Sequence, residues 1–133
     1  EKILNIIDGN MNLTFHKAFD YLKKPILELK TLIEFGFDTI LTSGGKNSAE
    51  EGISFINRLR NVANSNLTIM PGGGINSENF KSFIVNNYEW VHLSAKKQVN
   101  LEYKNIGEIQ FMTQPVYSIN VDTLQEIKNL NNI

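Results

Sequence analysis

The chain contains no cysteine, and it is poor in several other features that signal particular chemistries. Without cysteine, disulfide bonds, zinc–thiolate sites and thiolate catalysis are excluded within its 133 residues. Arginine occurs only at Arg58 and Arg60 and the net charge is −1, so the charge does not favour a nucleic acid or a membrane surface. No apolar run approaches the roughly 18 residues that cross a bilayer. We therefore expect that the chain binds neither a nucleic acid nor a membrane.

The remaining composition is that of one globular domain. Hydrophobic residues make up 41% of the chain and charged residues 20%, both near the average for globular proteins. A length of 133 residues suffices for one ordinary domain and not for two. Ile3, Leu4 and Ile7 already lie on one face of a helix predicted over residues 1–8, with no capping residue before them. We expect the amino end to be cut from a longer protein.

Short apolar segments alternate with helical patterns along the chain. We predict strands over residues 12–16, 37–42, 67–70 and 89–93. The helices between them have recognisable starts, which are Pro25 at a first helical position, a Ser48–Glu51 capping box, and Asn76 or Ser77 as a cap. Residues 98–120 lack a helical period and are predicted to form an extended arm. Asp122 and Gln125 are predicted to form a capping pair at the start of a last helix.

The predicted strand ends follow one another at intervals of 22 to 28 residues. This is the rhythm of βα units in a parallel sheet. Four strands do not close a (β/α)₈ barrel, which has eight strands and about 250 residues. We predict an α/β fold in which residues 1–133 are the carboxyl-terminal half of a TIM-like barrel, strands 5–8, with a missing amino-terminal half that supplies the rest. The alternative is a small open α/β sheet complete in itself.

Three consecutive glycines, Gly72, Gly73 and Gly74, follow the third predicted strand. Glycine adopts positive φ without a steric penalty, and it lets the backbone approach a ligand closely. The N–H groups of such a loop, with the free donors of the helix behind it, are typical of an anion pocket. The pattern predicts a site for a small phosphorylated or anionic metabolite, and the alternative is a tight turn with no ligand.

Polar residues and glycines cluster after each predicted strand, where ligands bind in parallel sheets and barrels. The predicted ligand-binding residues are His16, Lys17, Asp20, Ser43, Gly44, Gly45, Gly72, Gly73, Gly74, His92, Ser94 and Lys96. His16, Asp20 and His92 are candidates for proton transfer, although no catalytic residue is assigned. The alternative roles are a core histidine for each imidazole, a turn for Asp20 and a solvated charge for Lys96.

A metal site is the second hypothesis, with His16 and His92 as ligands. Cu(I) prefers thiolate and thioether ligands, and the chain offers no thiolate. The two histidines also lack the H-x-x-H spacing of many metal sites. Residue chemistry alone therefore gives little support to a dedicated copper site.

Four segments resemble successive motifs of the CutC family, the so-called copper homeostasis proteins. They begin at Thr14, Ile40, Ile69 and His92 and read TFHKAFD, ILTSGG, IMPGGG and HLSAK. They occur in the family's order within residues 1–97. The resemblance implies a TIM-like barrel, a cytoplasmic location, a homo-oligomer and a role in copper homeostasis, with copper as the implied cofactor.

Two positions of the chain bear on how closely it follows the family's pattern. The family usually has arginine where this chain has Lys17, and arginine or lysine at the position of Lys96. Lysine keeps the charge but lacks the bidentate fork of arginine. The expected function is that of a copper-binding or accessory protein in copper homeostasis. The alternatives are a barrel enzyme of unknown reaction on a small anionic metabolite, and a fragment with no activity of its own.

Overall fold

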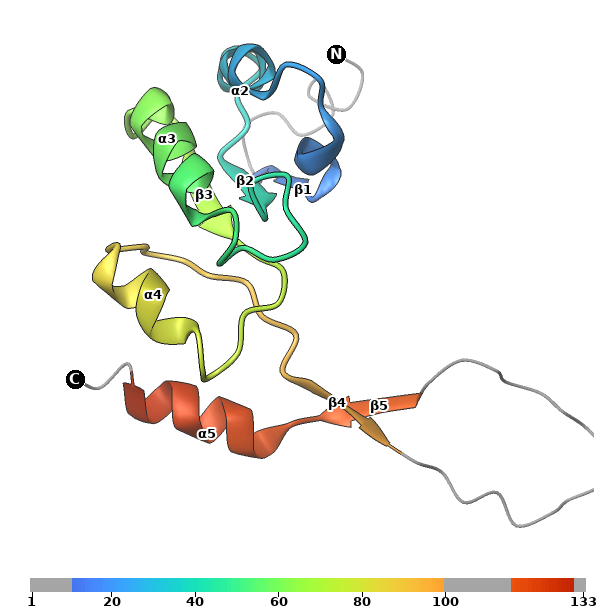
Figure 1. Cartoon of the computed structure of the whole chain (residues 1–133). Helices are drawn as coiled ribbons and strands as arrows, with labels where there is room; N and C mark the ends of the chain where they lie inside the picture. Colours follow the sequence, from blue (N-terminus) through green and yellow to red (C-terminus); the bar gives the residue numbers. More distant parts are fainter. Residues whose placement is uncertain (1–10, 100–115, 131–133) are drawn as a thin grey trace, which may run out of the picture. The chain divides into compact units, whose positions relative to one another are not determined.

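A computed structural model describes residues 11–99 and 116–130 of the chain (Figure 1). The chain forms two compact units that divide between Leu93 and Ser94, and each is described by itself. The helix predicted over residues 1–8 lies outside the described residues. The same holds for residues 100–115 of the predicted arm.

A three-stranded parallel sheet forms the centre of the first unit. Its strands, in spatial order, are β1 (Thr14–His16), β2 (Thr39–Thr42) and β3 (Thr68–Pro71). The pairing register aligns His16 with Leu41 and Leu41 with Met70. The strands are short and β2 is buried along most of its length, as expected for a parallel sheet covered by helices. Three of the four predicted strands are thus confirmed.

The fourth predicted strand, over residues 89–93, is wrong in its extent. It is reduced to a single parallel bridge between Gly72 and His92, in which the N–H of His92 donates to the carbonyl of Pro71 at 2.8 Å. Trp90 is 59% exposed, so this segment has no buried face to hold a longer ladder. The bridge still places His92 beside the end of β3.

Helices follow each strand of the sheet. A short 3₁₀ helix η1 (Ala18–Tyr21) follows β1, and the α-helices are α2 (Pro25–Glu34), α3 (Ile53–Ala63) and α4 (Phe80–Val85). Figure 1 shows α3 running alongside β3, with α2 next to it. Helix α2 begins at Pro25 as predicted, and α3 buries Ile56, Leu59 and Ala63. Helix α4 buries Phe80 and Phe83 and leaves Ile84 exposed.

At two of the predicted caps, the helix begins about one turn later than expected. Ser48 Oγ accepts the N–H of Glu51 at 3.2 Å, but α3 begins only at Ile53. Asn76 Oδ1 accepts the N–H of Glu78 at 2.9 Å, and α4 begins at Phe80. Each side chain therefore fixes the turn that leads from a glycine loop into a helix.

The second unit contains an antiparallel hairpin and a helix. The hairpin pairs β4 (Lys96–Val99) with β5 (Val116–Ile119), and α5 (Val121–Leu130) follows. Lys96 thus belongs to a strand and not to the predicted loop. Asn120 caps α5, because its Oδ1 accepts the N–H of Thr123 at 3.2 Å, whereas the sequence predicted Asp122. None of the described helices is long and apolar enough to span a membrane.

Candidate functional site

The carboxyl ends of the three parallel strands meet at one edge of the first unit. The N–H of Lys17, just after β1, donates to the carbonyl of Leu41, and the N–H of Gly72, just after β3, donates to Thr42, both at 2.9 Å. We call this edge the rim, and it comprises His16, Lys17, Asp20, Thr42, Ser43, Gly44, Gly45, Gly72, Gly73, Gly74 and His92. Ten of the twelve residues predicted to bind a ligand lie there. Ser94 and Lys96 belong to the second unit, where Lys96 Nζ lies 4.4 Å from the centre of the Tyr117 ring.

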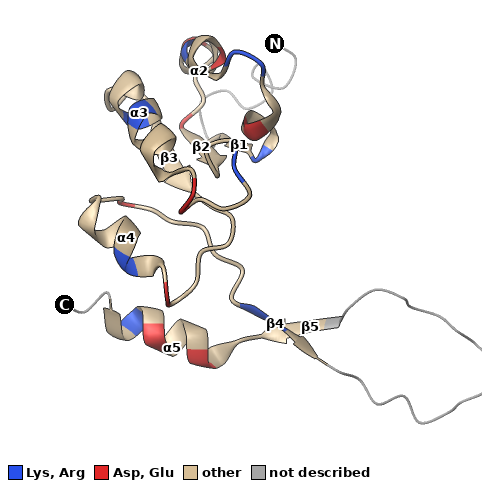
Figure 2. Cartoon of the chain, in the orientation of Figure 1, with Lys and Arg blue, Asp and Glu red and all other residues tan. Residues whose placement is uncertain are grey.

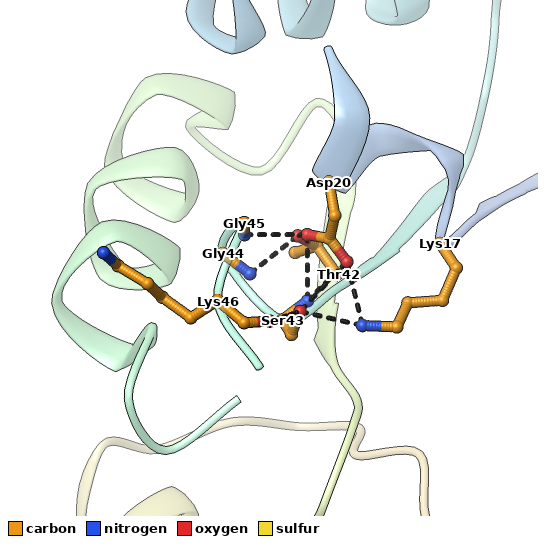
Figure 3. A network of polar contacts seen from close by, with 7 residues as sticks. All are labelled: Lys17, Asp20, Thr42, Ser43, Gly44, Gly45 and Lys46. Atoms are coloured by element: carbon orange, nitrogen blue, oxygen red, sulfur yellow. Dashed lines mark hydrogen bonds and ion pairs between the residues drawn. The ribbon is translucent and has the colours of Figure 1, made fainter. Parts of the chain in front are cut away.

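Asp20, on η1, is the hub of the rim (Figure 3). Its Oδ1 accepts the Thr42 hydroxyl, the N–H of Gly45 at 2.9 Å and the N–H of Ser43 at 3.1 Å. Its Oδ2 accepts the Lys17 ammonium at 2.9 Å and also lies 3.1 Å from the Ser43 N–H. The carboxylate therefore fixes the loop after β2 through hydrogen bonds to groups that a strand end would otherwise leave without acceptors.

Lys17 reaches across the rim from β1 to the loop after β2. Its ammonium lies 2.7 Å from Ser43 Oγ as well as 2.9 Å from Asp20 Oδ2. The Ser43 hydroxyl carries one proton, and the carbonyl of Lys46 at 2.6 Å is a closer acceptor for it than Asp20 at 3.1 Å. Ser43 Oγ then accepts from Lys17, which keeps a third N–H for another partner. The Lys17 side chain is 38% exposed, so that N–H is accessible.

The pKa of Asp20 shows that its carboxyl is ionised at neutral pH. Burial acts to raise this pKa. The hydrogen bonds from the Thr42 hydroxyl, the Gly45 N–H, Lys17 and the Ser43 N–H outweigh burial and hold the pKa below its ordinary value of 3.8. A carboxylate with both oxygens occupied by protein donors is suited to positioning its neighbours rather than to moving a proton.

The stability that Asp20 contributes is expected to disappear in acid. Because its pKa is lower in the folded protein than the ordinary 3.8, the folded state binds fewer protons at this group than the unfolded state. The contribution is complete well above that value and is lost as the pH falls through the folded pKa. In urea unfolding, the stability difference between the wild type and Asp20→Asn should therefore shrink from about pH 6 to about pH 3. A difference that stays constant over this range would contradict the assignment.

Glycines let the two loops of the rim approach each other. Gly73 has φ +120°, and a Cβ there would lie 3.2 Å from Lys17 Nζ. Gly74 has φ +68°, and its Cβ would lie 3.2 Å from the Cβ of Ser48 in the loop after β2. The Gly73 carbonyl accepts the N–H of Ala49 at 2.9 Å. The triple-glycine loop therefore packs directly on the Lys17 ammonium and on the facing loop.

The imidazoles of His16 and His92 lie against each other at the rim. Their ring centroids are 5.9 Å apart and the rings are nearly perpendicular, at 89°. Both residues are exposed, so neither is the core histidine of the alternative interpretation. Gly72 makes room for the pair, because a Cβ there would lie 3.1 Å from His92 Cβ. Two accessible imidazoles in contact are suited to proton transfer or to metal binding.

Helix α3 anchors the loop that leads from α4 to His92. Arg60 donates to the carbonyls of Asn86 at 2.7 Å and Asn87 at 3.2 Å, and its guanidinium lies 4.6 Å from the centre of the Tyr88 ring. The Tyr88 hydroxyl donates to Asn57 Oδ1 at 2.6 Å. Burial raises the pKa of Tyr88 above 10.0, with a smaller opposing effect from Arg60. Arg60 therefore has a structural role in placing His92.

The described residues fit a metal ion only in part. Among residues 11–99 and 116–130, no group of three or more histidine, cysteine, aspartate or glutamate side chains is arranged to hold one. His16 and His92 supply two ligands, whereas the oxygens of Asp20 are occupied by protein donors. A metal at this pair would have coordination positions left open to another molecule.

Charged residues of both signs are interspersed along the described ribbon (Figure 2). The rim itself carries one close pair of opposite charge, Lys17 with Asp20.

The sequence analysis omitted Thr42 from the predicted ligand-binding residues and did not identify Gly52. The importance of Gly52 depends on a packing contact that no local sequence pattern reveals. A Cβ at Gly52 would lie 1.9 Å from the carbonyl oxygen of Ser43.

Comparisons with known proteins agree on one family. The family model described as "CutC family" matches residues 1–97. A copper homeostasis protein cutC homolog from Mus musculus is 32% identical over 126 residues, which are 91% of this chain and 46% of that protein. A family protein CutC from Bacteroides fragilis is 33% identical over 124 residues, covering 90% of this chain and 49% of that protein.

A solved structure resembles the fold of this chain. The crystal structure of CutC from Streptococcus agalactiae superposes with a TM-score of 0.62 and 30% sequence identity, over 68% of this chain and 45% of that one. The chain spans about half the length of the curated relatives it matches.

Proposed function

The chain belongs to the CutC family, and we propose that it forms part of a (β/α)₈ barrel whose rim binds a small anionic metabolite. The sheet described here contributes three parallel strands to that barrel, and residues 1–133 correspond to its carboxyl-terminal half. The observation that carries the anion site is the Lys17 ammonium held against Gly73.

The contact between the two histidines supports a curved sheet. His16 lies on β1 and His92 pairs beyond β3, which is three strand spacings away, or about 14 Å in a flat sheet. Their ring centroids are nevertheless only 5.9 Å apart. Such a contact across β2 and β3 is most readily made when the sheet curls toward the rim, as it does in a barrel.

The anion site combines one cation with several backbone donors. Lys17 keeps a third N–H, and the backbone N–H groups of Asn47, Ser48 and Gly74 have no hydrogen-bond partner among the described residues. These donors belong to the two loops that meet at Gly74 and Ser48. We call Lys17, Asn47, Ser48, Gly73 and Gly74 the anion cradle. Backbone donors of this kind form the concavities in which proteins hold phosphate and carboxylate groups.

The nearby carboxylate of Asp20 limits the affinity of the cradle. Asp20 offsets much of the charge of Lys17, so the anion is held mainly by hydrogen bonds. We expect a dissociation constant for inorganic phosphate of about 1 mM, which is about 4 kcal/mol of binding free energy. Further contacts to the rest of a metabolite would add to this value.

Binding of inorganic phosphate, followed by amide NMR, tests the anion site. In the wild type, the amide signals of Ser48, Gly73 and Gly74 should shift and saturate with added phosphate. Lys17→Met should weaken this binding about tenfold, because it removes a charged hydrogen bond. Lys81→Met, which removes an exposed lysine on α4, is the matched control and should bind phosphate like the wild type. Amide signals that do not respond to phosphate would refute the anion site.

A second candidate function is that of a copper-binding or accessory protein in copper homeostasis. It is supported by the name of the Mus musculus relative and by the two exposed imidazoles in contact at the rim. Imidazole nitrogen is a suitable ligand for copper and zinc. Isothermal titration with copper should show binding that is lost in His16→Gln and His92→Gln. Copper affinity that is unchanged in both variants would remove these residues from any copper site.

A further inference from the structure

Two neighbouring contacts cross the rim from the end of β1 to the segments beyond β3. The His16 and His92 rings lie against each other, with centroids 5.9 Å apart. One residue further along the chain from His16, Lys17 Nζ would lie 3.2 Å from a Cβ on Gly73. Gly72, against which His92 packs, directly precedes Gly73. One residue step, about 3.8 Å between Cα atoms, therefore separates the imidazole pair from the anion cradle on each side of the rim.

Lys17 has an unusual backbone conformation for a residue with a long side chain. In an extended strand, consecutive side chains point to opposite faces, so His16 and Lys17 would point apart. Lys17 instead has φ +54°, in the left-handed region that lysine rarely adopts. This conformation ends the alternation of the strand, and the ammonium contacts Asp20 and Ser43. Unfavourable backbone of this kind is typical of positions that hold a side chain for ligand binding.

The ring nitrogens of His16 and His92 are available to a ligand. Both side chains are exposed, and among residues 11–99 and 116–130 no hydrogen bond involves a ring nitrogen of either histidine. A neutral imidazole offers one N–H donor and one acceptor nitrogen, and an alcohol hydroxyl is likewise both a donor and an acceptor. Two imidazoles in contact can therefore donate to and accept from one hydroxyl group that lies against both rings.

We propose that the ligand of the rim is a phosphate monoester with a hydroxyl group on the carbon next to its ester carbon, as in phosphorylated polyols and sugars. The phosphate binds in the anion cradle, and His16 and His92 hydrogen-bond the hydroxyl group. Two carbons span a separation comparable to the one residue step between the two groups. This inference rests on the proposed anion site and deepens it, because it names the class of anion and makes the imidazoles determinants of specificity.

Ethyl phosphate and hydroxyethyl phosphate differ by a single hydroxyl group and test this specificity directly. Each is titrated into the full chain and followed by amide and histidine-ring NMR, with a chelator present so that no metal ion contributes. The wild type should bind hydroxyethyl phosphate about fivefold more tightly, as expected for an added neutral hydrogen bond or two. At equal saturation, the ring nitrogen signals of His16 and His92 should shift more with hydroxyethyl phosphate than with ethyl phosphate.

Variants separate the hydroxyl contact from the phosphate contact. His16→Phe and His92→Phe keep a ring but remove its nitrogens, and each should lose most of the preference for hydroxyethyl phosphate. Lys17→Met should weaken the binding of both ligands by a similar factor, because both place a phosphate in the cradle. Lys81→Met, the exposed lysine on α4, should bind both ligands like the wild type.

The comparison of the two ligands on the wild type needs no variant, so it stands even where a histidine variant folds poorly. Equal affinities of the wild type for the two ligands would overturn the hydroxyl contact, and so would a preference that persists in both phenylalanine variants. In either case, saturable shifts of Gly73 and Gly74 with ethyl phosphate would leave the anion site standing. The absence of saturable binding for both ligands would refute the anion site as well.

Discussion

Replacing Gly52 with alanine is expected to destabilise the protein by about 3 kcal/mol or more, because overpacking against rigid backbone has no inexpensive relief. The added Cβ would lie 1.9 Å from the Ser43 carbonyl oxygen and 2.8 Å from its carbonyl carbon. Both are backbone atoms of the loop that Asp20 fixes, so the loop or the start of α3 must move. The midpoint of urea unfolding should fall accordingly, and phosphate binding at the rim should weaken with it.

Gly36→Ala is the matched control for this prediction. Gly36 ends α2 with φ +75°, and nothing lies within 4 Å of the Cβ that alanine would add. Its cost is the left-handed backbone alone, about 1–2 kcal/mol. Equal losses of stability in the two variants would show that the close contact at Gly52 relaxes, and the packing explanation would then be wrong.

Removing the Asp20 carboxylate is expected to have the second large effect. Asp20→Ala leaves the Thr42 hydroxyl and the N–H groups of Ser43 and Gly45 without their acceptor, and it leaves Lys17 without its counter-ion. We expect a loss of about 3 kcal/mol in the free energy of unfolding, because several donors lose a charged partner at a nearly buried position. Chemical denaturation at neutral pH measures it.

Asp38→Ala provides the comparison for Asp20. The Asp38 carboxylate is also an acceptor for backbone, but among the residues that the structure describes it accepts only the N–H of Leu13, at 2.7 Å in an exposed setting. Its loss should cost about 1 kcal/mol or less. If Asp20→Ala proved no more harmful than Asp38→Ala, the carboxylate would not be the hub of the rim.

Much of the rim was predictable because it follows from topology. The helical period of Leu29 and Leu32 and the apolar runs around Ile40 and Ile69 indicated βα units, and parallel strands necessarily end at the same edge. That rule alone brought the residues after β1, β2 and β3 together. It failed at residues 89–93, where an apolar run with an exposed Trp90 forms one bridge instead of a strand.

The partners of Asp20 were not predictable from the sequence. Apart from Lys17, they lie 22 to 25 residues away along the chain, and a short 3₁₀ helix with no strong pattern decides which way the carboxylate points. The contact at Gly52 depends equally on how the start of α3 packs on the loop after β2. The imidazole pair depends on where residues from different strand ends meet in space, which the strand pattern does not encode. Self-association, a cytoplasmic location and the roles of Ser94 and Lys96 stay predictions.

The hydrogen bonds between Asp20 and the loop after β2 should affect how quickly a ligand associates. The Asp20 carboxylate already holds the loop after β2, so this loop loses little conformational freedom when a ligand binds. At the proposed site, an anion would therefore bind without a slow rearrangement, and we expect its association rate to be set by the rate of encounter. The proposed anion site is in this sense preorganised for its ligand.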